Sequence, residues 1–437
     1  MKNVLIVSPH FPPINAPDMQ RVRLVLPHLR AHGWEPTVLA VAPKSVEGGV
    51  VETRLLDTFP ADIRVVRVHG LPPTATRWLG VGSLWWRCRR ALMGAGDYLL
   101  ENERFDLVFI STTQFGAFSL GPRWRARFGV PYMVDYQDPW ISDYYERSGA
   151  RPPGGRLKFA VSQWSARRHE PRVVRDASGL IVVSEGYTQA LSARYPWFDA
   201  KRATLLPFGA APEDFAAARD YRPAQPLIDF QDGNFHHVYV GRGGSDMSRA
   251  LVILFRAFKR YRDSHPDRAA RMRFHFIGTD YAPPPHGRDW VLPVATVEGV
   301  APQVTEHRAR IPYFDALYYL RNAGALLAIG SDDPAYSASK IFPCVLARRP
   351  MLLISPRESP ALKFAEQVAA GVCCGFSAED DNAALATDVH QRWFVADAAA
   401  QPVVFDEAGF APFLASVLTG RLAKVFDGCL PATRRKC

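Results

Sequence analysis

The 437-residue sequence lacks several features that would assign a protein to a class at once. Its six cysteines form no C-x-x-C pair and have no companion histidine at zinc-ligand spacing, which indicates buried thiols in a reducing compartment. No apolar run reaches the roughly 18 residues that a membrane-spanning helix needs. The apolar run before Ser8 is also too short for a signal peptide. We therefore expect a cytoplasmic protein.

Sequence signatures of nucleic-acid binding and of dinucleotide binding are missing as well. The formal net charge of +10 indicates anionic partners, but no zinc-finger, homeodomain or RNP-type motif accompanies it, so we expect no nucleic acid partner. Neither half has a G-x-G-x-x-G after its first strand, which makes a Rossmann oxidoreductase the weakest of the functions considered. Phosphorylated small molecules and acidic lipids remain as partners.

One basic stretch, RWLGVGSLWWRCRRALMG at residues 77–94, interleaves tryptophan with arginine. Tryptophan beside arginine suits a membrane interface, where the ring sits at the boundary and the guanidinium meets phosphate. The alternative is a core helix with an arginine face toward solvent. An anionic membrane surface is thus a candidate partner, with the protein peripheral at the inner membrane face.

Apolar runs alternate with helical patterns through the first half of the chain, as expected for a parallel α/β domain. A helix is predicted at 20–33, and strands are predicted at 2–8, 35–41, 105–111, 131–137 and 179–184. The second half repeats the alternation, with helices at 247–263, 313–323 and 340–349 and strands at 235–241, 273–278, 294–299, 324–330 and 350–355. This predicts two Rossmann-like domains, at 1–220 and 235–405, joined by a linker at 221–234 and followed by a helical segment at 406–437.

Five motifs in order resemble glycosyltransferase family 4, in particular bacterial members that build cell-surface polysaccharides. They are VSPHFPP, VSEGYTQAL, LLPFGAAPEDF, VYVGRGGSDM and ARRPMLLIS. The resemblance implies the GT-B fold, in which two Rossmann-like domains face each other across a cleft. It also implies a nucleotide-sugar donor and retention of the anomeric configuration.

The chain departs from this family at two places. Family members carry two glutamates eight positions apart, and counting back from Pro350 puts Ala335 and Pro343 in their places. The glycine pair that usually follows F-P-P is replaced by INAPDMQRVR, so the close backbone approach that glycine permits must be met otherwise. The second glutamate normally binds the nucleotide ribose, so ordinary ribose recognition is not expected here.

Donor phosphates without a D-x-D metal site must be neutralised by arginine, lysine and helix amino termini. Arg242 and Gly243 follow a predicted strand, and Lys340 begins a predicted helix. The alternatives are an Arg242–Asp246 ion pair and a surface lysine. We predict no metal and no cofactor other than the nucleotide-sugar substrate.

The loop after residue 330 supplies further donor-site candidates. Asp332 and Asp333 could contact donor-sugar hydroxyls in place of the missing glutamate, or could cap the following helix. Tyr336 and Ser339 could line the same pocket.

The segment EHRARIPYFDAL, at 306–317, corresponds to the family's base-binding region. Ile311 and Tyr313 are therefore base-pocket candidates by resemblance. Glu306 and Arg310, taken at helical spacing, could form a surface pair.

Acceptor-side candidates lie at strand ends of the first domain. Asp138 follows a predicted strand and could deprotonate the acceptor hydroxyl, or form an Asx-type turn before Pro139. His10 could contact substrate or be structural, and Arg21 could meet an acceptor phosphate or face solvent.

The leading hypothesis is a glycosyltransferase that moves a sugar from a nucleotide-diphosphate donor to a lipid-linked or polysaccharide acceptor. The alternative, which the missing glutamates favour, is a non-catalytic GT-B protein that binds or regulates a partner. Donor turnover separates the two.

Overall fold

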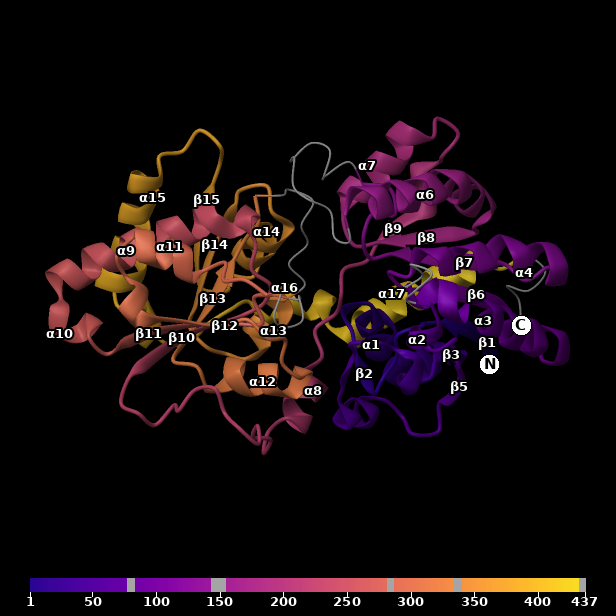
Figure 1. Ribbon diagram of the computed structural model, residues 1–437, viewed down its shortest axis with the longest axis horizontal. Coiled ribbons are helices and arrows are strands. Elements are labelled where there is room, and N and C mark those ends of the chain that lie inside the picture. The colour runs from indigo at the N-terminus through magenta and orange to yellow at the C-terminus, as the bar shows by residue number, and fades with distance from the viewer. Residues whose placement is uncertain (77–82, 143–154, 281–286, 333–339, 432–437) are drawn as a thin grey trace. The chain divides into compact units, whose positions relative to one another are not determined.

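The computed structural model describes residues 1–76, 83–142, 155–280, 287–332 and 340–431. The chain forms two compact units. Unit 1 comprises Met1–Gly209 and Ala415–Cys437, and unit 2 comprises Ala210–Leu414. The chain therefore passes from unit 1 to unit 2 and returns to unit 1 for its last helix (Figure 1).

Unit 1 is built on a seven-stranded sheet in which every neighbouring pair is parallel. Its order is β5 (Arg64–Val68), β3 (Trp34–Val41), β1 (Lys2–Val7), β6 (Leu107–Ser111), β7 (Tyr132–Tyr136), β8 (Gly179–Val182) and β9 (Ala203–Leu205). The apolar runs that predicted strands are buried on both faces, as parallel sheets require. Two short strands, β2 (Ile14–Asn15) and β4 (Val50–Val51), pair antiparallel beside the sheet.

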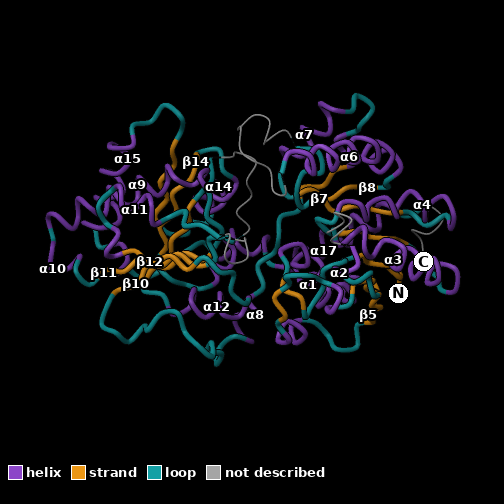
Figure 2. Tube along the Cα trace, viewed as in Figure 1, coloured by secondary structure: helices purple, strands orange, loops and turns teal. Residues whose placement is uncertain are grey.

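Helices cover both faces of the unit 1 sheet (Figure 2). They are α1 (Gln20–Leu29), α2 (Pro73–Thr76), α3 (Leu84–Asn102), α4 (Leu120–Phe128), α6 (Arg156–Asp176), α7 (Glu185–Arg194) and α17 (Ala415–Cys429). α17 packs along α1, where Leu418, Leu422 and Phe426 join the core under β1 and β6. The carboxyl-terminal helix is thus part of the first Rossmann-like unit.

Unit 2 has a six-stranded parallel sheet of the same design. Its order is β12 (Val304–His307), β11 (Met272–Ile277), β10 (Phe235–Val240), β13 (Ala325–Ile329), β14 (Met351–Pro356) and β15 (Val372–Phe376). Its helices are α8 (Pro212–Ala217), α9 (Ser248–Ser264), α10 (Pro266–Ala269), α11 (Leu292–Val297), α12 (Tyr313–Asn322), α13 (Ile341–Leu346), α14 (Pro360–Gln367), α15 (Asn382–Val389) and α16 (Glu407–Phe410).

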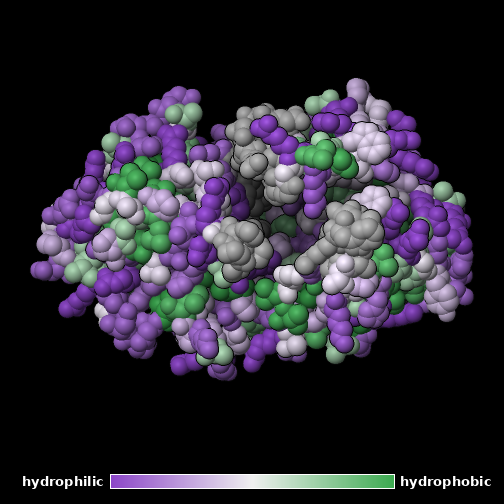
Figure 3. Space-filling view, viewed as in Figure 1, coloured by the Kyte–Doolittle hydropathy of each residue, from purple (hydrophilic) through white to green (hydrophobic). Residues whose placement is uncertain are grey.

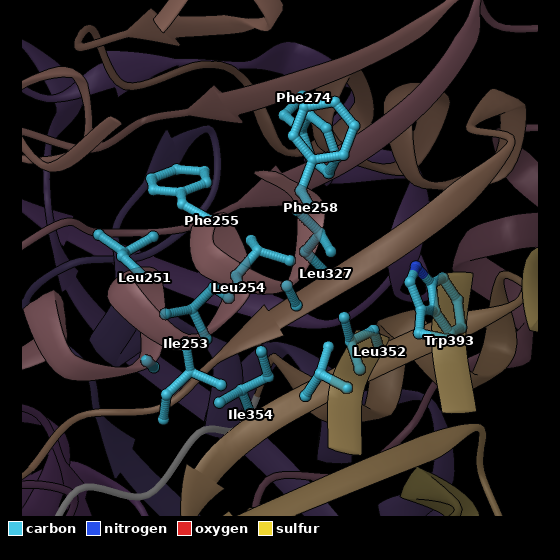
Figure 4. Close-up of a cluster of buried hydrophobic side chains, with 14 of the residues drawn as sticks. Leu251, Ile253, Leu254, Phe255, Phe258, Phe274, Leu327, Leu352, Ile354 and Trp393 are labelled. Carbon is cyan, nitrogen blue, oxygen red and sulfur yellow. The ribbon is translucent and has the colours of Figure 1, made fainter. Parts of the chain in front are cut away.

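The unit 2 core lies on both faces of this sheet. On one face the apolar side of α9 meets the strands and Trp393, with Leu254 and Phe258 pointing toward Leu327 and Phe274 (Figure 4). On the other face α12, α13 and α14 form a second cluster. Two layers of helix around one parallel sheet define a Rossmann-like unit.

Three expectations about organisation were wrong. The domain boundary falls at Gly209, before the predicted 220, and residues 221–234 are no linker because Ile228 is buried in the unit 2 core. The strand predicted at 294–299 is helix α11, although its valines favour strand. β5, β9, β12 and β15 were not predicted.

No helix among the described residues combines the length and apolar character that crossing a membrane would require.

Candidate functional site

Each parallel sheet has one switch point, where the chain stops adding strands toward one edge of the sheet and starts adding them toward the other edge. In unit 1 it lies between β1 and β6, and in unit 2 between β10 and β13. Open α/β sheets bind ligands outside the carboxyl ends of the strands at such a switch point, because the connecting loops diverge there and leave a crevice.

In unit 2 the loops that follow β10 and β11 run side by side. The Gly241 N–H donates to Ile277 O over 2.9 Å, and the Gly243 N–H donates to Thr279 O over 2.7 Å. A Cβ at position 243 would lie 2.8 Å from Trp290 Cβ, so the tight packing requires glycine. Gly243 was predicted to bring its backbone to phosphate, but its N–H is already used inside the protein. Its role is to let the loop pack.

Lys340 lies beside the end of β10, and its contact with phosphate stays a prediction. A Cβ added at Gly241 would be 2.7 Å from Lys340 Nζ and 2.5 Å from Tyr239 Oη. Lys340 lies in the connection after β13, directly before α13, and its ammonium reaches the end of β10. It therefore links the two strands of the switch point. Only a residue without a side chain at 241 leaves this space.

Arg242 forms the ion pair that was the alternative to phosphate binding. Its two terminal nitrogens bind the two Asp246 carboxylate oxygens at 3.0 and 2.6 Å. Asp246 also accepts from Ser331 Oγ, and its carbonyl accepts from the Asp332 N–H at 2.7 Å. Asp246 thereby connects the loop after β10 to the loop after β13. Its pKa is below the ordinary value because Arg242 and Ser331 outweigh the effect of burial.

Asp332 is exposed next to this network. Its carboxyl has a raised pKa, caused first by desolvation, with Arg249 acting in the opposite direction and the Asp246 charge adding to the rise. The structure therefore places Asp332 near two charged groups at the switch point. Asp333, Tyr336 and Ser339 lie outside the described residues.

The predicted base-binding segment has a different structure from the one expected. Glu306 lies on β12, and its carboxylate accepts from the backbone N–H groups of Trp290, Val291 and Leu292, each at 2.9 Å. The helical pairing of Glu306 with Arg310 was wrong, because helix α12 begins only at Tyr313. Ile311 packs partly buried against the core, and Tyr313 Oη donates to Asp214 Oδ2 at 2.6 Å. Their base contact stays a prediction.

In unit 1 a histidine and a buried carboxylate meet at the switch point. His10 follows β1, and its Nδ1 lies 2.9 and 3.1 Å from the two oxygens of Asp18. Asp18 also accepts from Thr112 Oγ1 at 2.8 Å and from the Thr113 N–H at 3.1 Å, both directly after β6. Burial by itself would raise the pKa of Asp18, but His10 and the threonine donors outweigh it and hold that pKa below its ordinary value.

Asp138 lies just beyond the end of β7. Its pKa is raised to about 6, first by desolvation and then by the negative charge of Asp18, which places the two carboxyls in one neighbourhood. Its side chain is nevertheless open to solvent. Deprotonation of the acceptor hydroxyl by Asp138 stays a prediction.

Arg21 does not meet an acceptor. Its side chain is 2% exposed, and its nitrogens donate to Asp135 Oδ2 at 3.2 Å, to Pro207 O at 2.6 Å and to Leu206 O at 2.5 Å. The prediction of a phosphate contact or a solvent-facing role was wrong, because these buried acceptors use the guanidinium. Arg21 fixes α1 to β7 and to the chain after β9.

The tryptophan and arginine stretch is divided between core and surface. Arg87 is buried and donates to the carbonyls of Ser45 and Leu71, and Trp85 lies so close to Gly116 that a Cβ there would come within 2.2 Å of its ring. Trp86 is exposed, with the Arg89 guanidinium 4.3 Å from its ring centre. Trp78 and its neighbours at 77–82 lie outside the described residues.

Among the described ranges, no group of three or more histidine, cysteine or acidic side chains could hold a metal ion. Sequence reasoning missed Asp18, Thr112 and Ser331, and it named Asp246 only as the ion-pair partner of Arg242. The available signal was the polar residue at the end of each apolar run, since the carboxyl ends of parallel strands share one edge.

Comparisons with known proteins agree with this geometry. Residues 20–209 match the family described as glycosyl transferase 4-like domain. No curated protein sequence matches the chain significantly. Among solved structures, HepE of Anabaena, in complex with UDP and glucose, is 14% identical with a TM-score of 0.60 and covers 97% of this chain and 99% of its own. The chain has the GT-B fold of this solved structure.

Two further solved structures share this fold over both units. Sucrose-phosphate synthase from Thermosynechococcus elongatus is 15% identical, with a TM-score of 0.62 and 98% of each chain covered. The UDP-forming trehalose-phosphate synthase from Burkholderia xenovorans is 14% identical, with a TM-score of 0.60, and covers 98% of this chain and 99% of its own. The chain therefore shares the GT-B fold with these proteins at low sequence identity.

Proposed function

We propose that this protein is a glycosyltransferase that moves a sugar from a nucleotide-diphosphate donor to a lipid-linked or polysaccharide acceptor, with no metal ion. The observation that carries the proposal is the Lys340 ammonium beside Gly241 at the unit 2 switch point. The diphosphate would bind there, because a leaving group of this charge must be neutralised as the bond to the sugar breaks. Lysine supplies that charge as a point donor.

Arg242 supports the same site. Its guanidinium is bound by both oxygens of the Asp246 carboxylate. Asp246 also sets the orientation of the arginine, so a phosphate would meet a guanidinium that is already fixed. Asp332 would then approach the donor sugar from the neighbouring loop.

The solved structures suggest which donor to test first. HepE has been solved with UDP and with UDP-glucose, and the trehalose-phosphate synthase from Burkholderia xenovorans is UDP-forming. We infer a uridine nucleotide for this protein from that likeness of fold. The resemblance to family 4 implies retention of the anomeric configuration.

The second part of the proposal is a cytoplasmic protein that is peripheral at an anionic membrane. Leu157, Val161 and Trp164 lie along one side of α6 and are 81%, 59% and 68% exposed. Exposed Arg167 and Arg168 follow on the same helix. Figure 3 shows hydrophobic side chains in the region of α6 and α7. An apolar stripe beside basic side chains suits the boundary between lipid headgroups and acyl chains.

A screen of nucleotides by thermal shift tests the proposed function. A ligand that binds the folded state at 100 times its Kd adds about 2.7 kcal/mol of stability, so UDP and UDP-sugars should raise the melting temperature. Release of UDP from UDP-glucose should follow at a measurable rate. Binding without release would favour the non-catalytic alternative, and the absence of any shift with UDP, GDP, CDP or their sugars would contradict the donor site.

A further inference from the structure

A cavity opens at the amino-terminal edge of the unit 2 sheet, where β14 and β15 begin. Its volume is about 310 Å³, which is at the small end of the range for ligand pockets. Apolar side chains form most of its wall, among them Val345, Met351, Val372 and Phe405. Lys340 lies at the opposite, carboxyl-terminal edge of the sheet, so this cavity is separate from the proposed donor site.

Trp393 brings a buried hydrogen-bond donor to the wall of this cavity. The side chain is 2% exposed, and among the described residues its Nε1–H has no acceptor. A buried indole N–H usually has a partner, because a buried donor without one costs free energy. Trp393 lies on a turn of π-helix, His390–Val395, a form that occurs frequently at functional sites. An oxygen atom of a ligand would satisfy this donor.

Arg349 brings a positive charge to the same wall. It is exposed, and its Nε donates to Arg321 O at 2.6 Å. Its neighbour Arg348 pairs with Glu407, whereas Arg349 pairs with no carboxylate in the described part of the chain. The residues that line the cavity include no aspartate and no glutamate. The charge of the wall therefore suits an anionic group on the ligand.

The turns around this cavity have left-handed backbone at residues that carry side chains. Arg348, Ala369 and Asp397 have φ values of 50°, 51° and 49°, and among the described residues no others except glycines have positive φ. Ala369 lines the cavity, and the other two adjoin Arg349 and Ala398, which also line it. A helix that ends in this conformation usually has glycine there. Strained backbone of this kind is concentrated at ligand sites, because the surrounding structure must hold it in place.

Apolar side chains also continue from the cavity to the protein surface. Val403 and Val404 line the cavity and are nevertheless 39% and 77% exposed. A ligand with an apolar chain would remove this surface from water, which is favourable through the hydrophobic effect. The cavity and its rim thus suit a molecule that is apolar over most of its length.

We propose that this cavity binds a fatty acid of medium chain length. The chain would lie among the apolar side chains, and the carboxylate would accept from the Trp393 N–H and from the Arg349 guanidinium. This inference goes beyond the proposed function and does not depend on it, because the residues that carry it take no part in the donor site.

Calorimetric titration of the full chain with decanoate, kept below the concentration at which it aggregates, tests the site. We expect saturable binding of a single decanoate per chain. Arg349→Met should raise the Kd about tenfold or more, because a charge-assisted bond is lost. Trp393→Phe keeps an aromatic ring but removes the N–H, and should raise the Kd roughly twofold to tenfold. Arg357→Met, which removes an exposed arginine outside this cavity, is the matched control and should bind as wild type does.

A third variant and a neutral ligand separate the charge of the site from its fold. Val403→Asp places a carboxylate at the partly exposed rim, so it should weaken binding of decanoate by repulsion. Decanol has a chain of the same length but no charge, and its affinity should be the same in wild type and in Arg349→Met. Thermal unfolding without ligand shows whether each variant is folded.

Two results would overturn the inference. The first is the absence of saturable binding of octanoate, decanoate and dodecanoate by wild type. The second is wild-type affinity for decanoate in folded Arg349→Met or in folded Val403→Asp, which would show that the fatty acid binds elsewhere on the basic protein. UDP titrated into the same wild-type sample decides the proposed function separately, because neither result involves the nucleotide.

Discussion

Replacing Arg21 by methionine should destabilise unit 1 without acting on substrate. The change removes the donor to Asp135, whose side chain is fully buried, and leaves the carbonyls of Leu206 and Pro207 without that donor. Ser111 Oγ and Gln137 Nε2, at 2.8 and 3.1 Å, still donate to Asp135 but carry no charge. Breaking a buried pair in this way costs about 3 to 5 kcal/mol, because one charge stays buried without compensation.

A double-mutant cycle measures the pair directly. D135N should also destabilise, whereas R21M with D135N should cost less than the sum of the single changes, by about 0.5 to 3 kcal/mol. Urea unfolding gives the free energies, and hydrogen exchange followed by mass spectrometry assigns each transition to a unit. The unit 2 transition should not move. Arg30, which makes exposed pairs with Glu35 and Asp62, provides the control R30M, with little change expected.

A free energy of unfolding of R21M within 1 kcal/mol of wild type would contradict this prediction. Full stability of R21M combined with loss of transfer would also contradict it, because Arg21 would then contact substrate as the sequence suggested.

Two further predictions concern acid stability and the membrane. His237 is buried between Phe274 and Trp393, and burial lowers its pKa to about 3, so below pH 6.5 the unfolded chain binds a proton that the folded chain does not. As the pH falls, this group should therefore lower the free energy of unfolding by up to roughly 1.4 kcal/mol per pH unit. H237F should remove that slope, whereas the exposed-site variant H69Q should keep it. Equal slopes for the two variants in urea unfolding from pH 7 to 5 would refute His237 as the cause. Replacing Trp164, Arg167 and Arg168 by serine should release the protein from anionic liposomes in flotation, whereas serine at the exposed Tyr98 should not. Unchanged flotation of the triple variant would contradict membrane binding by the exposed side of α6.

The parallel sheets could be predicted because each long apolar run is buried on both faces, and β1, β10 and β13 lie close to their expected bounds. Helix α11 could not be predicted from the sequence. Its first N–H groups are satisfied by Glu306 from a distant strand, so a long-range contact outweighs the β-branched residues of the segment.

The candidate sites divide in the same way. Lys340 was predicted to begin a helix, and the structure places it directly before α13 and beside Gly241. Arg21 could not be predicted, because helical periodicity does not show that an arginine faces a buried aspartate 114 positions later. Asp18 was missed for a related reason, since the turn that brings it to His10 has no periodic pattern.

Calorimetric titration with UDP tests the central claim most directly. Lys340→Met and Arg242→Met should each weaken binding by about 1.5 to 3 kcal/mol, which is roughly a tenfold to 150-fold rise in Kd, because each loses a charge-assisted bond to phosphate. Lys363→Met, which removes an exposed lysine paired with Glu358, is the matched control and should bind as wild type does. Wild-type affinity in both the Lys340 and the Arg242 variants would show that the nucleotide diphosphate does not bind at the unit 2 switch point.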